Sequence, residues 1–173
     1  MDYLNHIQYQ KGQYSNIMAD NVVVYIWQGQ AYIPTQAKYE SGIFIGTEPV
    51  LIVELNSSEL LAAIQTIKDK GHKILHEPKT REEFLASDVG KKDPVLAATG
   101  ARNWIQLAKK GVSYTIGWTE HEIRIDMSRL DKKGRWEFDP EKVRKLSPTT
   151  QLSEVVKIIL DDIRLRPEIQ KNQ

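Results

Sequence analysis

An unbroken apolar run from Val22 to Trp27 constrains the fold more than any other segment of the chain. Every residue in it is β-branched or aromatic, the composition that favours a β-strand. Because successive side chains of a strand point to opposite faces, this strand needs apolar cover on both sides. We therefore expect a central strand in a sheet that other elements cover on both faces.

Shorter extended segments follow this run. Ala31–Ile33 continues the strand pattern, and Pro34 is expected to end it because proline cannot donate to a strand ladder. Ile43–Ile45 and Val50–Val53 are two further apolar runs, and Gly46 is expected to interrupt them. The first third of the chain therefore predicts several short strands.

The best-delimited helix is predicted between Ser57 and Gly71. Leu60 and Ile64 lie on one apolar face at helical spacing. Ser57 or Ser58 is expected to cap its first turn, since a serine oxygen accepts hydrogen bonds from free amides. Gly71 is expected to end it, as glycine commonly does at the C-terminal end of a helix.

Four smaller elements are expected between this helix and residue 111. His72–Leu75 is predicted as a short strand, and a capping box at Thr80 begins a short helix. Ser87–Pro94 is predicted as the longest loop. Val95–Ala98 is expected to be extended or buried, and Ala101–Lys110 to be helical.

Strict alternation of apolar and polar residues marks the clearest β region. It runs through 112–118 and 123–128 and returns at 135–138, with Gly134 available for a tight hairpin turn. Three strands joined in sequence in this way form a meander.

A broad apolar stripe over 150–165 predicts a final helix packed on the sheet. The whole pattern predicts one α+β domain over 1–173, with a mainly antiparallel sheet, a C-terminal meander and about three to four helices. Residues 1–21 are expected to form an arm or an edge strand, and 167–173 a frayed tail.

Composition excludes several classes of protein. The chain has no cysteine, which rules out disulfide scaffolds, cysteine-ligated metals and thiol nucleophiles. Its 24 basic and 23 acidic residues give a net charge of +1, which does not favour a dedicated nucleic-acid binder. No apolar run could span a bilayer and no signal-peptide pattern is present, so we expect a cytoplasmic domain without a membrane partner.

No metal or nucleophile motif is recognisable. His72 and His76 would lie about 13 Å apart on one strand face, too far to share a metal ion. His121-Glu122 lacks the second histidine of a zinc-protease motif, and there is no Gly-x-Ser-x-Gly. We therefore expect no metal, no cofactor and no catalytic residue.

One pair of carboxylates keeps an enzyme as the alternative. Glu122 and Asp126 lie on one face of the predicted strand with Arg124 between them, and His121 is adjacent. Such a set could provide an acid and a base for a small hydrolase or a nuclease-like enzyme. Alternating charge is also typical of the solvated face of a meander.

Aromatic residues suggest a further alternative. Tyr114, Trp118 and Trp136 could stack on bases in an RNA-binding module. We expect at least two of the three to pack in the core instead, together with Trp27 and Trp104. An exposed Trp118 or Trp136 would suit a protein interface, where tryptophan is enriched.

Several segments together resemble small bacterial proteins of unassigned activity. They are 31–42, Glu48-Pro49-Val50, 78–84, Asn103-Trp104-Ile105 and the meander. Small cysteine-free α+β proteins of this kind also resemble immunity proteins of bacterial toxin systems, including contact-dependent growth inhibition.

That resemblance implies a protein that binds its cognate toxin domain, often over the active site, without chemistry of its own. Partners of nuclease toxins are often acidic, which speeds association with a basic toxin. This chain is nearly neutral, so either its toxin is not a basic nuclease or its acids are clustered locally.

The sequence therefore predicts a non-catalytic protein whose partner is a cognate toxin domain, with its oligomeric state left open. The solvated face of the meander is the expected contact surface, with polar groups for complementarity and one tryptophan as an anchor. The predicted contact residues are Trp118, Glu120, Glu122, Arg124, Asp126 and Trp136.

Overall fold

The computed structural model describes residues 20–166, so most of the expected N-terminal arm and the 167–173 tail lie outside the described residues. The strands are β1 (Asp20–Trp27), β2 (Gln30–Tyr39), β3 (Phe44–Glu54), β4 (His72–Leu75), β5 (Val112–Trp118), β6 (Ile123–Leu130), β7 (Trp136–Phe138) and β8 (Arg144–Leu146). The helices are α2 (Ser57–Lys70), α3 (Arg81–Ala86), α4 (Asp88–Lys91), α5 (Pro94–Thr99), α6 (Trp104–Lys110) and α7 (Leu152–Arg164), with a 3-10 turn, η1 (Pro140–Lys142).

The eight strands form one sheet, and six of them follow one another in the order β3-β2-β1-β5-β6-β7. Pairs along this path are antiparallel, and β8 is antiparallel to β6. β4 pairs in parallel with the far half of β2. The predicted α+β class, the mainly antiparallel sheet and the meander are confirmed, and β1 occupies the interior position that its apolar run predicts.

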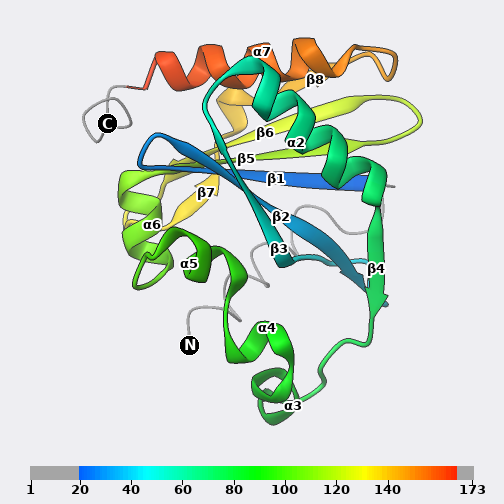
Figure 1. Cartoon of the computed structure of the whole chain (residues 1–173), viewed down its shortest axis with the longest axis vertical. Helices are drawn as coiled ribbons and strands as arrows, with labels where there is room; N and C mark the ends of the chain where they lie inside the picture. Colours follow the sequence, from blue (N-terminus) through cyan, green and yellow to red (C-terminus); the bar gives the residue numbers. More distant parts are fainter. Residues whose placement is uncertain (1–19, 167–173) are drawn as a thin grey trace.

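Helices cover both faces of this sheet. Val24 of β1 packs in the cluster beneath α2 and α7, which also includes Ile64 and Ile159. Its neighbour Tyr25 faces the other way, into the cluster that includes Leu107 of α6. In Figure 1, α7 lies at the top of the molecule, and α3 and α4 lie at the bottom, beyond β4.

The predictions that Pro34 and Gly46 interrupt strands are wrong. β2 continues past Pro34 because the register with β3 shifts between Pro34 and Thr35, an irregularity that accommodates a residue unable to donate. Gly46 pairs with Gln36 in the ladder. A Cβ at Gly46 would lie 3.1 Å from Cγ of Pro34, so glycine makes room for the proline ring in the neighbouring strand.

The first long helix ends as predicted but begins one residue earlier than the expected serine caps. Asn56 is the N-cap, and its Oδ1 accepts from the backbone N–H of Glu59 at 2.9 Å. Gly71 ends α2 with φ 67°, a value that favours glycine. At α3 the predicted cap is confirmed, because Oγ1 of Thr80 accepts from the N–H of Glu83 at 3.1 Å.

Two segments expected to be irregular or extended contain helices. Residues 87–94 include the single turn α4, and Val95–Ala98 belong to α5. Asp93 starts α5 because its Oδ1 accepts from Val95 and Leu96, while its Oδ2 accepts from the indole of Trp104. The pKa of Asp93 is raised, because the effect of burial is larger than the opposing effect of these hydrogen bonds.

A buried polar cluster joins α7 to the sheet. Oδ2 of Asp162 accepts from the hydroxyl of Tyr114 at 2.8 Å and from Nε of Arg166 at 2.5 Å. Oδ1 of Asp162 lies 2.8 Å from Nζ of Lys142, at the end of η1. Arg166 also donates to the carbonyl of Ser128 at 3.0 Å. Hydrogen bonds and ion pairs at one end of α7 therefore hold the helix against the sheet, in addition to the packing of its apolar stripe.

Among residues 20–166, the helices are all too short or too polar to cross a membrane.

Candidate protein-binding surface

The predicted contact residues lie on β5, on β6, in the turn between them and, for Trp136, on β7. Tyr114 and Ile116 of β5, with Ile123 and Ile125 of β6, face the core beneath α2 and α7. Arg124 and the other alternate residues of β6 therefore project from the opposite face, as the alternation predicts. Arg124 pairs with Gly117 of β5 across the ladder.

Arg124 and Asp126 form a tight pair on that face. Nε of Arg124 donates to Oδ1 of Asp126 at 2.8 Å, and the Arg124 side chain is 27% exposed against 3% for Asp126. The guanidinium carbon also lies 5.3 Å from the centre of the Phe138 ring. Asp126 is thus too deeply buried to contact a partner, and its role here is to hold Arg124 in position.

The turn after β5 presents two acidic residues. Oγ1 of Thr119 accepts from the N–H groups of His121 and Glu122, at 3.1 and 3.0 Å, and so fixes the turn. Glu120 is exposed within it. Glu122 lies 3.2 Å from Nζ of Lys145 on the adjoining strand β8.

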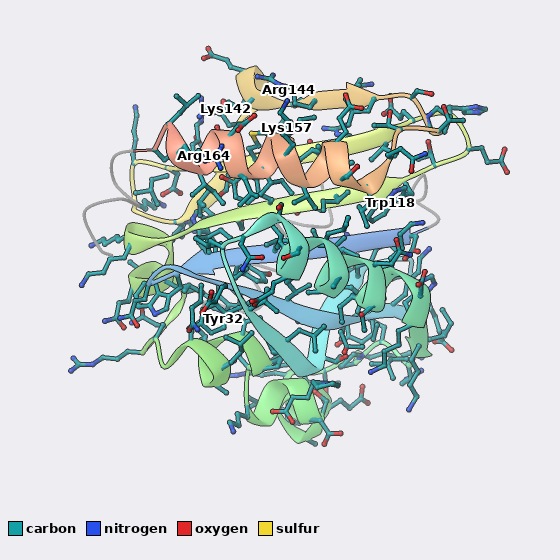
Figure 2. All side chains as sticks on the ribbon, turned by 45° about the horizontal axis from the view of Figure 1, so that its top comes forward. Tyr32, Trp118, Lys142, Arg144, Lys157 and Arg164 are labelled. Atoms are coloured by element: carbon teal, nitrogen blue, oxygen red, sulfur yellow. The ribbon has the colours of Figure 1, made fainter. Side chains whose placement is uncertain are left out.

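The two candidate anchor tryptophans differ in burial. Trp136 is only 9% exposed, its ring centre lies 5.6 Å from that of Tyr25, and its indole N–H donates to the Gly111 carbonyl at 3.4 Å. It therefore packs in the core and is removed from the contact surface. Trp118 is half-buried at the end of β5, where Nζ of Lys68 lies 5.2 Å from its ring centre. Figure 2 shows Trp118 at the edge of the molecule.

Two of the three aromatic residues that could stack on bases are in the core. Tyr114 is fully buried and Trp136 nearly so, which confirms the expectation that most of this set packs internally. Trp118 alone is only half-buried, at the end of the interior strand β5 and on the face that α2 and α7 cover.

The carboxylates of the enzyme alternative are not brought together. Glu122 and Asp126 lie four residues apart on one strand, about 13 Å along it. Each has its own cation, Lys145 for Glu122 and Arg124 for Asp126. This geometry does not place an acid and a base on opposite sides of one reacting bond.

The histidines are likewise separate. His72 lies 3.9 Å from Asp20, and His76 lies 3.2 Å from Glu40. In the described part of the chain, no group of three or more His, Asp and Glu residues could hold a metal ion.

Cations also gather around α7. Figure 2 shows Lys157 and Arg164 on α7, Lys142 in η1 and Arg144 in β8. Two of them have acidic partners, since Lys142 lies 2.8 Å from Asp162 and Arg164 lies 3.1 Å from Asp161. Much of this positive charge is therefore compensated locally.

The structure contains a cleft that the sequence did not indicate, which we call the β4–α4 cleft. It is a hollow of about 1060 Å³ between β2, β3 and β4 on one side and the α3–α4 segment on the other. Its lysines come from α2, β4 and the residue after α4, so no linear motif marks it. Residues that line it include Ala37, Tyr39, Lys70, His72, Lys73 and Lys92.

The cleft adjoins the end of the meander. Asp20 pairs with Trp118 across β1 and β5, and the same Asp20 lies 3.9 Å from His72 at the start of β4. The last turn of α2 connects the two regions, because Lys68 covers Trp118 while Lys70 lines the cleft. We call Trp118, Glu120, Glu122 and Arg124 the meander-end surface.

Known proteins are similar to this chain in fold. No protein-family model and no curated protein sequence matches it. Among solved structures, it is similar to the "Protein of Unknown Function NMB0488" from Neisseria meningitidis, with a TM-score of 0.61 and 15% identity over 89% of this chain and 100% of that chain.

A second similar structure is a chain of the CdiA-CT/CdiI toxin and immunity complex from Yersinia pseudotuberculosis. It has a TM-score of 0.60 and 12% identity, over 86% of this chain and 99% of that chain. At these identities the likeness establishes a shared fold.

Proposed function

We propose that the chain is an immunity protein that neutralises a cognate bacterial toxin domain by binding it directly in the cytoplasm. The observation that carries this proposal is the likeness of fold to a chain of a toxin and immunity complex, over 86% of this chain and 99% of the other. Fold alone does not specify function, so the proposal also needs a surface suited to a partner.

The meander-end surface has the groups that protein recognition needs. Arg124 is held by Asp126 and by the Phe138 ring, so it loses little side-chain freedom when a partner binds. Glu120 has no ion pair among residues 20–166 and is exposed in a hydrogen-bonded turn. Trp118 lies on the opposite face of the sheet from Arg124, against the cluster beneath α2 and α7, and its accessible part provides an aromatic contact at the end of β5.

The test is co-expression with the product of the neighbouring open reading frame, as the candidate toxin. We expect the chain to restore growth of cells that express the toxin, and to be purified with it as a stoichiometric complex. Absence of both rescue and complex with the unaltered chain would overturn the proposal.

A charge variant then tests the surface. Glu120→Lys with Arg124→Ala is expected to weaken toxin binding by about tenfold or more, since it reverses one contact and removes another. Glu154→Lys, an exposed acidic position on α7, is the matched control and should bind as the unaltered chain does. Normal binding by the double variant would exclude the meander-end surface while leaving the immunity function intact.

A further inference from the structure

The β4–α4 cleft has a floor of mixed polarity and a rim with more cations than anions, because buried Thr35 and Gln36 line it beside Ala37 and Tyr39. Ala37 and Tyr39 on its floor are 1% and 4% exposed. The rim has three lysines, Lys70, Lys73 and Lys92, against two carboxylates, Glu48 and Asp88. His72 and His76 also line it.

The rim lysines have no acidic partner. Among residues 20–166, none of the three forms an ion pair, as is the case for most lysines in that range. Nζ of Lys70 has only a 3.4 Å hydrogen bond to Oγ1 of Thr35. Nδ1 of His72 is buried and has no hydrogen-bond partner in the described part of the chain. The three lysines therefore have unused capacity to donate to an anion, whereas Nδ1 of His72 faces Asp20 at 3.9 Å.

We propose that the β4–α4 cleft receives an acidic segment of the partner protein, with Lys70, Lys73 and Lys92 pairing with its carboxylates. This inference rests on the proposed immunity function and adds the chemistry of the partner. Three lysines without acidic partners, beside a floor that is partly apolar, complement a segment that carries both apolar side chains and carboxylates.

The size and position of the cleft favour a protein segment over a small molecule. Its volume of about 1060 Å³ is at the upper limit of small-molecule sites, which are about 300–1,000 Å³. It also adjoins the meander-end surface through the last turn of α2, where Lys68 covers Trp118. A single partner can therefore contact the turn after β5 and insert a segment into the cleft.

The first experiment measures binding of the cognate toxin domain by calorimetry. Lys73→Glu with Lys92→Glu, both at exposed positions, is expected to weaken binding at least tenfold. Lys132→Glu with Lys133→Glu, in the exposed turn between β6 and β7, makes the same charge change elsewhere and should bind like the unaltered chain. Undiminished binding by the cleft variant, once the unaltered chain binds, would overturn the inference without affecting the proposed function.

The second experiment needs no toxin and uses a hexaglutamate peptide on the full chain. We expect saturable shifts of the His72 and His76 imidazole signals in NMR spectra, lost in the Lys73→Glu, Lys92→Glu variant. Absence of saturable shifts would overturn the inference. Equal shifts of the same imidazole signals with inorganic phosphate, added at the same concentration of negative charge, would also overturn it. They would indicate a site for small anions. If the toxin does not bind the unaltered chain, the proposed function fails. The peptide experiment then decides by itself whether the cleft binds an acidic segment.

Discussion

The hydroxyl of Tyr114 donates a 2.8 Å hydrogen bond to Oδ2 of Asp162, joining the middle of β5 to α7. Tyr114 is fully buried, and Asp162 is 9% exposed. Lys142 and Arg166 complete the pairing of the Asp162 carboxylate. The helix that covers one face of the meander is therefore held by a hydrogen-bonded charge cluster as well as by its apolar stripe.

Removing parts of this cluster is expected to destabilise the fold in a graded way. Tyr114→Phe should lower the free energy of unfolding by about 1–2 kcal/mol, because it deletes one buried hydrogen bond. Asp162→Asn should lower it by about 3 kcal/mol, because it leaves Arg166 without its charge partner. Urea unfolding measures both.

Arg164→Ala is the matched control for those variants. It removes an exposed ion pair with Asp161 on the same helix, and such pairs contribute less than about 1 kcal/mol. A loss from Asp162→Asn no larger than the loss from Arg164→Ala would contradict the role assigned to the cluster.

The same cluster predicts a dependence of stability on pH. Burial alone would raise the pKa of Asp162, but hydrogen bonds from Lys142, Tyr114 and Arg166 outweigh it, and the pKa is lowered. A carboxyl with a lowered folded pKa stabilises the fold above its unfolded pKa of about 3.9, and this contribution is lost as pH falls through the folded pKa.

The stability difference between the unaltered chain and Asp162→Asn should therefore be constant from about pH 5 to pH 7 and shrink below about pH 4. Urea unfolding at a series of pH values measures it. A difference that widened toward acid pH would be the opposite of this expectation.

The cap of α2 provides a local test of the observed boundary. Asn56→Ala is expected to lower the free energy of unfolding by about 1 kcal/mol, because Oδ1 of Asn56 accepts from Glu59 N–H at 2.9 Å. Ser57→Ala should change it by less than about 0.5 kcal/mol, since Ser57 is exposed within the helix. Thermal unfolding compares the two, and a larger loss from Ser57→Ala would favour the boundary expected from the sequence.

Trp136 and Trp118 are expected to respond differently to truncation. Trp136→Ala should destabilise the fold by about 3–5 kcal/mol, because the ring packs against Tyr25 and Trp104 in the core. Trp118→Ala should destabilise it less and should weaken toxin binding in a chain that remains folded. Urea unfolding and calorimetry together separate the two effects. A Trp136→Ala chain as stable as the unaltered one would show that Trp136 is not a core residue.

The sequence by itself determined the elements whose periodicity follows directly from burial. The alternation of β5 and β6 and the stripe of α7 repeat at the spacing of their own backbone, and the unbroken run at β1 consists of β-branched and aromatic residues, so local pattern is sufficient to predict all of them. The capping oxygen at Thr80 is local for the same reason, because it bonds an amide only three residues away.

Tertiary structure decided the features that depend on contacts distant in sequence. Pro34 remains within a strand because Gly46 of the neighbouring strand makes room for its ring. Trp136 is buried because α6 brings Trp104 against it. The lysines of the cleft meet because β4 pairs in parallel with β2, which positions the end of α2 and the α3–α4 segment around one hollow. Burial of a side chain and convergence of charges are properties of the packed chain, and neighbours in sequence do not specify them.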